Sequence, residues 1–271
     1  MSERDGGERM EAVIVHAPVA PMVAEASVRA EQTTQLLLGE TADLLERQGE
    51  WRRLRAHRDG YEGWVNAGYL RETTAAAAAA WAARATGWSE GAQLDLGGHA
   101  RPLPLGARVV LEPGIAVELP DGRRGLIRGG YVREMAEIAT EARDMAPERW
   151  ALRHFEGVPY EWGGRTAWGV DCSGLVQTTW AARGLVLPRD SSKQAACGEP
   201  VALDRIAPGD LLFFHGETSR TITHVAFAGP GETLIHSTIS CGGVLVEPCG
   251  AGTRAAPLMT RLVAARRLPS A

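Results

Sequence analysis

The most constraining feature of the sequence is the stretch from residue 163 to residue 188, in which a glycine-rich loop leads into one apolar segment. The first seven residues include three glycines, and after Asp171 apolar residues recur at helical spacing as far as Trp180. Gly184 and Pro188 stand where a helix of this length would end. The pattern predicts a helix that begins directly after Asp171.

This helix would place Cys172 in its first turn, with Asp171 as the capping residue. Unpaired backbone N–H groups and the helix dipole stabilise an anion there, so we expect a thiol with a lowered pKa. A free cysteine is more commonly a small buried apolar residue. The loop, the cap and the first-turn position together favour Cys172 as a nucleophile.

A thiol nucleophile needs a general base, and two histidines lie on neighbouring predicted strands. His224 and His236 each stand six residues from Pro230 in THVAFAGPGETLIHS. A hairpin centred on Pro230 would make them a cross-strand pair on one face, whereas a loop of even length would put them on opposite faces. We predict His224 as the base and His236 as the residue that orients it.

The first half of the chain has a different sequence pattern. Residues 11–72 alternate short apolar runs with turn residues, which is typical of a small barrel or sandwich. Residues 75–134 repeat this alternation of short apolar runs and turn residues, with Asp121-Gly122 as a hairpin turn. Although alanine favours helices, we interpret the alanine run at 75–80 as a linker or a strand leading into the second unit. The sequence thus predicts two β-units of one type.

From residue 135 the composition becomes that of an α+β domain. Apolar residues between 134 and 156 follow helical spacing, and Pro147 suits the first position of a second helix. Predicted strands follow, one of them ending at His215. We expect a third domain over 135–271.

Composition excludes several classes of protein. The 29 basic and 33 acidic residues give a net charge of −4, which argues against a nucleic-acid partner. No apolar run approaches the roughly 20 residues that span a bilayer, and the first residues do not resemble a signal peptide. We therefore expect a cytoplasmic protein with no membrane partner.

Cysteine spacing argues against a metal site. The chain has four cysteines and no Cys-x-x-Cys pair, so structural zinc is not expected. Nothing in the sequence implies a metal or an organic cofactor. We expect Cys197, Cys241 and Cys249 to be buried thiols.

Several segments resemble those of known families. PYEWGGRTAWGVDCSGLVQ, PRDSSKQ, APGDLLFF, THVAF and LIHS resemble the NlpC/P60 cysteine peptidases, which cut bacterial cell-wall peptides. QLLLGE, EWRRLR and DGYEGWV resemble bacterial SH3 (SH3b) domains. The resemblance implies an α+β fold: a papain-like NlpC/P60 domain, with helices packed on an antiparallel sheet, preceded by two small SH3b-like β-barrels.

The order of these parts resembles the γ-D-glutamyl-L-diamino acid endopeptidases of muropeptide recycling. By that resemblance Cys172 is the nucleophile, His224 the base and His236 the third catalytic residue. The partner would be a murein peptide with a free N-terminal L-Ala, cut between γ-D-Glu and diaminopimelate or Lys to release L-Ala-D-Glu. The resemblance assigns binding of this substrate to Asp171, Ser173, Ser191, Tyr61 and an acidic residue of the first barrel, for which we choose Glu31 over Glu25.

Two alternative functions remain open. The same papain-like site could serve an amidase or acyltransferase on another substrate. The chain could also be an SH3b protein that binds cell wall and carries a vestigial peptidase. The acidic and hydroxyl groups next to Cys172 favour a peptide with a free amine, and the intact Cys172, His224 and His236 argue against degeneracy.

Overall fold

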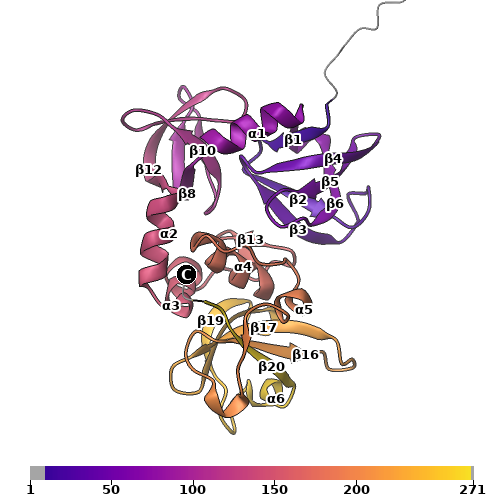
Figure 1. Ribbon diagram of the computed structural model, residues 1–271, viewed down its shortest axis with the longest axis vertical. Helices are drawn as coiled ribbons and strands as arrows, with labels where there is room; N and C mark the ends of the chain where they lie inside the picture. The colour runs from indigo at the N-terminus through magenta and orange to yellow at the C-terminus, as the bar shows by residue number, and fades with distance from the viewer. Residues whose placement is uncertain (1–9, 270–271) are drawn as a thin grey trace, which may run out of the picture. The chain divides into compact units, whose positions relative to one another are not determined.

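The computed structural model describes residues 10–269 and consists of two compact units, divided between Glu134 and Met135 (Figure 1). The polar, glycine-containing start of the sequence, residues 1–10, predicts a loose end, and residues 1–9 of it lie outside the described part. No helix within 10–269 is long and apolar enough to cross a membrane. Each unit is described by itself.

The first unit contains a seven-stranded antiparallel sheet in the order β3-β2-β6-β5-β4-β1-β7. The strands are β1 (Ala12–Val15), β2 (Val19–Val23), β3 (Gln32–Leu37), β4 (Thr41–Gln48), β5 (Trp51–Ala56), β6 (Glu62–Asn66) and β7 (Leu70–Thr73), with the short helix η1 (Ala67–Tyr69) between the last two. Val13, Leu36, Leu54 and Val65 are fully buried in one apolar core. Side chains that alternate along these strands therefore build the core, as the apolar runs predict.

A second antiparallel sheet of the same unit has the order β10-β11-β12-β8-β9, and β10 also pairs with β8. Its strands are β8 (Gly87–Asp95), β9 (Ala100–Pro102), β10 (Arg108–Leu111), β11 (Ala116–Glu118) and β12 (Arg124–Glu134). The turn at Asp121-Gly122 joins β11 to β12, with Gly122 at φ +80°. That these two sheets are closed SH3b-type barrels, with domains at 11–72 and 75–134, stays a prediction.

The alanine run is a helix, so our interpretation of it as a linker or a strand is wrong. Helix α1 (Ala75–Arg84) begins after Thr74, whose hydroxyl accepts a hydrogen bond from a backbone N–H of the first turn. Ala78 and Trp81 are buried, and the indole N–H of Trp81 donates to the carbonyl of Gly39 at 2.9 Å. The segment is helical because alanine has a high helix propensity and because one face of the helix, with Ala78 and Trp81, is buried.

The second unit begins with helices α2 (Met135–Asp144) and α3 (Pro147–Phe155), followed by the hairpin of β13 (Arg165–Thr166) and β14 (Gly169–Val170). Next come α4 (Cys172–Ala182) and α5 (Ser191–Gln194). Pro147 stands at the start of α3, as predicted. Every residue of α4 except Ala181 is buried, and the buried polar side chains of Gln177, Thr178 and Thr179 donate to backbone carbonyls.

The helices precede a six-stranded antiparallel sheet in the order β15-β20-β16-β17-β18-β19. The strands are β15 (Glu199–Pro200), β16 (Leu211–His215), β17 (Ile222–Gly229), β18 (Thr233–Thr238), β19 (Gly243–Pro248) and β20 (Leu262–Arg267); η2 (Leu203–Arg205), η3 (Ile239–Cys241) and α6 (Ala256–Met259) lie in the connections. Helix α4 packs on β17 and β18 (Figure 1). This arrangement confirms the predicted α+β class and brings the start of α4 to the strands that carry the two histidines.

Candidate functional site

Cys172 occupies the first position of α4, as predicted. Asp171 caps the helix: its Oδ1 accepts the N–H of Gly174 at 2.7 Å, and its Oδ2 accepts the N–H of Gly163 at 2.8 Å. A Cβ atom on Gly174 would lie 2.1 Å from the carbonyl oxygen of Gly164. Only glycine permits this close approach, so the glycine-rich loop and the helix start form one tightly packed element.

The ionisation of the Cys172 thiol is decided by burial. Only 7% of the residue is exposed, and burial, together with the charge of Asp171, raises the pKa of Cys172 to about 12. Backbone N–H groups of Val225 and Ser173 and the charge of Arg189 oppose this rise. Our expectation of a lowered pKa is therefore wrong for the site without substrate, because desolvation outweighs the helix terminus.

His224 on β17 and His236 on β18 are joined by a hydrogen bond of 2.8 Å between Nε2 and Nδ1. Gly229 pairs with Thr233, so the loop is centred on Gly231, one residue later than predicted. The predicted direct opposition is wrong by two residues, and His224 lies diagonal to His236. The histidines still share a face, because a shift of two residues preserves the alternation of a strand.

Both imidazoles are neutral near pH 7. Burial lowers the pKa of His224 to about 3, with contributions from His236 and the positive charge of Arg261. Burial also lowers the pKa of His236, against the raising effect of Glu247. Because the N–H of the adjacent Val225 reaches the thiol of Cys172, β17 brings a neutral base to a neutral nucleophile.

Beyond His236 lies a carboxylate that sequence analysis missed. Oε2 of Glu247, on β19, is 2.9 Å from Nε2 of His236 and 2.5 Å from a guanidinium nitrogen of Arg254. Glu247 pairs with Leu234, so its side chain lies on the same face of the sheet as that of His236. The sequence does show an acidic residue within the apolar run GVLVEP. It can be recognised as a partner of His236 only when the pairing of β19 with β18 is known.

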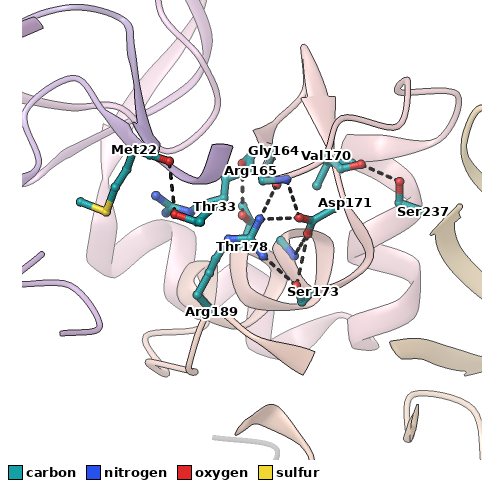
Figure 2. Close-up of polar contacts among 12 residues, drawn as sticks. Met22, Thr33, Gly164, Arg165, Val170, Asp171, Ser173, Thr178, Arg189 and Ser237 are labelled. Atoms are coloured by element: carbon teal, nitrogen blue, oxygen red, sulfur yellow. Dashed lines mark hydrogen bonds and ion pairs between the residues drawn. The ribbon is translucent and has the colours of Figure 1, made fainter. Parts of the chain in front are cut away.

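Arg189 is a second residue that sequence analysis missed. Its guanidinium donates to Asp171 Oδ2 at 2.6 Å and to the Ser173 hydroxyl at 2.7 Å, and all three side chains are buried. Figure 2 shows these side chains converging beside the loop at Gly164. Ser191, predicted from the same PRDS motif, is buried at the start of α5.

Two other predicted residues belong to the first unit. Tyr61 is partly buried against the core of the seven-stranded sheet, and Glu31 is exposed directly before β3. Glu25, the alternative to Glu31, is exposed too. A role for Tyr61 or Glu31 in binding substrate stays a prediction.

The remaining cysteines differ from our expectation. Cys197 and Cys249 are half-buried and Cys241 is exposed, all as free thiols, because all three lie in segments that connect the larger elements, Cys241 at the end of η3 and Cys249 directly after β19. Residues 10–269 contain no cluster of three or more His, Cys, Asp or Glu side chains placed to hold a metal ion.

Comparison with known proteins places these features in families. Residues 157–259, which include Cys172, His224 and His236, match the NlpC/P60 family, and residues 23–70 match the bacterial dipeptidyl-peptidase Sh3 domain. The chain is 32% identical over 222 residues to the γ-D-glutamyl-L-lysine dipeptidyl-peptidase of Bacillus subtilis, with 75% of this chain and 71% of that protein covered. The enzyme of the same name from Bacillus cereus is 29% identical over 227 residues, and the match covers 75% of this chain and 66% of that protein.

Solved structures confirm the fold. The crystal structure of an NlpC/P60 family protein from Bacillus cereus superimposes with a TM-score of 0.77 at 20% identity, over 95% of this chain and all of that one. An NlpC/P60 endopeptidase from Photobacterium damselae gives a TM-score of 0.67 at 15% identity, over 97% of this chain and 72% of that one.

Proposed function

Since the chain belongs to the NlpC/P60 family of peptidases, we propose that it is a cysteine peptidase acting on cell-wall peptides that carry a free N-terminal L-Ala. It hydrolyses the bond between γ-D-Glu and the following diamino acid, diaminopimelate or Lys, and releases L-Ala-D-Glu. The observation that carries this proposal is the thiol of Cys172 at a helix start, reached by the N–H of Val225, the residue after His224, with His224 hydrogen-bonded to His236. The relatives named for γ-D-glutamyl-L-lysine peptides support the substrate class.

The proposed reaction starts with attack of the Cys172 sulfur on the γ-carbonyl carbon of D-Glu. Nε2 of His224 is bonded to His236, so Nδ1 is the nitrogen that accepts the thiol proton. The backbone N–H of Cys172, at the first position of α4, stabilises the oxyanion that forms. His224 then gives the proton to the departing amine, and water hydrolyses the remaining thioester.

The protonation states constrain the timing of these steps. With a thiol pKa of about 12 and an imidazole pKa of about 3, a separated thiolate and imidazolium is strongly disfavoured before substrate binds. Proton transfer therefore accompanies the attack, when the developing negative charge moves to the carbonyl oxygen. General-base catalysis by a neutral histidine fits this sequence of events.

The polar groups around Asp171 support a substrate with a free amine. Four donors already surround this carboxylate, and the Ser173 hydroxyl at 3.3 Å makes the longest of the four bonds. In the proposed complex, the ammonium group of L-Ala takes the place of that hydroxyl. Arg189 and Ser191 supply a cation and a hydroxyl for the α-carboxylate that a γ-linked D-Glu leaves free.

A free L-Ala amine exists only on peptides already released from the glycan strand, because the same nitrogen is an amide in intact wall. This chemistry is the reason for placing the proposed reaction in muropeptide recycling. A pocket that holds an ammonium group next to Asp171 would discriminate against an amide nitrogen, which carries no positive charge and has fewer hydrogen-bond donors for the carboxylate.

The test is to digest L-Ala-γ-D-Glu-diaminopimelate beside its N-acetylated twin and to identify the products by mass spectrometry. We expect release of L-Ala-D-Glu from the free-amine peptide alone, and no release by Cys172→Ala. Cleavage of both peptides would keep the peptidase and remove the amine requirement and the recycling role. Cleavage of neither, or full activity of Cys172→Ala, would refute the proposal.

A further inference from the structure

Three hydrogen bonds form a continuous chain behind the proposed base. His224 Nε2 lies 2.8 Å from His236 Nδ1, His236 Nε2 lies 2.9 Å from Glu247 Oε2, and the same oxygen lies 2.5 Å from Arg254 Nη2. Only 1% of His236 and 5% of Glu247 are exposed. Water therefore has little opportunity to replace the bond between His236 and Glu247, whereas the side chain of Arg254 is 48% exposed and holds Glu247 from the solvent side.

The chemistry of Arg254 and Glu247 determines which atom donates and which accepts in each of these three hydrogen bonds. Arginine has donors only, so Glu247 Oε2 accepts a hydrogen bond from Arg254. The same oxygen also accepts from His236, which therefore carries its proton on Nε2. In a neutral ring the other nitrogen, Nδ1, is then a bare acceptor.

The acceptor on His236 determines the state of His224 in turn. Nδ1 of His236 can only accept, so Nε2 of His224 must carry the proton. A neutral His224 then has a bare Nδ1, the nitrogen that is not bonded to His236.

We propose that Glu247, held by Arg254, sets the tautomers of both histidines and thereby keeps Nδ1 of His224 free to accept the thiol proton. Glu247 does not touch the reacting atoms, so it is a positioning residue that acts through His236. The inference rests on the proposed function for the use of that nitrogen, whereas the tautomers themselves can be measured without substrate.

The first experiment measures the tautomers directly. The full chain is labelled with ¹⁵N-histidine, and the ring nitrogens of His224 and His236 are identified by the signals lost in His224→Gln and His236→Gln. At pH 7 we expect a proton on Nε2 and a bare Nδ1 in both rings. A proton on Nδ1 of His224 would overturn the proposal, whatever the activity.

The second experiment removes the acceptor. In Glu247→Met the acceptor for Nε2 of His236 is lost while the donor-only Arg254, whose charge acts on His236, remains. This favours the opposite tautomer of His236 and transmits it to His224. We expect the Nδ1–H form of His224 in the spectrum and a fall in kcat of about 10- to 100-fold, the effect of losing one hydrogen bond to a charged group. KM should change less than threefold, since substrate does not contact Glu247.

Two further variants separate tautomer control from simple support of the fold. Glu247→Gln keeps an acceptor oxygen, so it should restore the wild-type tautomers and most of kcat. Glu199→Met makes the same exchange as Glu247→Met on β15, an exposed strand at the opposite edge of the sheet, and should leave both readouts unchanged. A folded Glu247→Met with wild-type tautomers or wild-type kcat would overturn the proposal.

If Glu247→Met does not fold, the wild-type spectrum still tests the proposal, because a proton on Nδ1 of His224 would overturn it. Failure of the proposed function is distinguishable as well. It would appear as the expected tautomers in a protein that cleaves neither test peptide.

Discussion

At the scale of single residues, two opposing effects act on Cys172. The helix start and the neighbouring N–H groups favour a thiolate, while burial and the carboxylate of Asp171 favour the protonated thiol. Burial dominates and raises the pKa of Cys172 to about 12, because desolvation outweighs the opposing positive charge of Arg189 and the nearby backbone N–H groups. The nucleophile is thus held neutral until substrate is present.

The pH dependence of alkylation checks this state. We expect the rate of Cys172 modification by iodoacetamide to rise about tenfold per pH unit from pH 6 to pH 9 without reaching a plateau, because the thiolate fraction stays small. Peptide mass spectrometry separates Cys172 from the three other free thiols, of which the exposed Cys241 is the internal comparison. A rate that is constant between pH 6 and pH 8 would indicate a preformed thiolate and contradict this assignment.

At the scale of secondary-structure elements, the histidines of β17 and β18 make the free energy of unfolding depend on pH. Burial lowers the pKa of both His224 and His236, whereas the unfolded chain protonates them near pH 6.5. Below that pH the unfolded state binds more protons, so the free energy of unfolding must fall as pH falls.

Hydrogen exchange of peptides from β17 and β18 measures this effect in the second unit alone. Well below pH 6.5 we expect the free energy of opening to fall by as much as about 1.4 kcal/mol per pH unit for each histidine. His224→Asn should make the slope shallower, and His99→Asn, at an exposed position of the first unit, should leave it unchanged. An unaltered slope in His224→Asn would show that His224 is not protected from protonation.

Helix α1 offers a matched test of packing. Ala78 is fully buried, in a cluster with Ala12, Ile14 and Trp81, while Ala79 is exposed. We expect Ala78→Leu to lower the free energy of unfolding by about 1–3 kcal/mol through overpacking, and Ala79→Leu to change it by less than about 0.5 kcal/mol. Urea unfolding of the two variants measures the difference, and equal effects would contradict burial of this face of α1.

At the scale of the whole molecule, the two family matches fall in different units. The Sh3 match at 23–70 lies within the first unit, and the NlpC/P60 match at 157–259 lies within the second. The groups that carry the proposed covalent chemistry, Cys172, His224 and His236, all come from the second unit. The first unit contributes a fold that the relatives share and, by our prediction, contacts to substrate.

An acyl-enzyme can be detected by offering the intact protein a competing nucleophile. If a thioester forms on Cys172, hydroxylamine should divert part of the product to the γ-hydroxamate of L-Ala-D-Glu, while water alone yields only the free acid. Mass spectrometry distinguishes the two products. Absence of hydroxamate at high hydroxylamine, with hydrolysis continuing, would argue for direct attack by water and against a covalent intermediate.

Local sequence by itself determined much of this protein. The cap at Asp171, the helix start at Cys172, the strands that carry His224 and His236 and the turn at Asp121-Gly122 follow from short-range preferences, which neighbouring residues decide among themselves. The resemblance of these segments to NlpC/P60 peptidases was confirmed for the same reason, because the motifs are contiguous.

Only the tertiary structure decided the features that depend on distant residues. Burial of Cys172 reversed the expected shift of its pKa, the length of one loop moved the histidines from opposite to diagonal, and a buried face turned the alanine run into a packed helix. Glu247 and Arg189 became recognisable as site residues only beside their partners. Desolvation, register and long-range hydrogen bonds are properties of the packed chain, and no local pattern contains them.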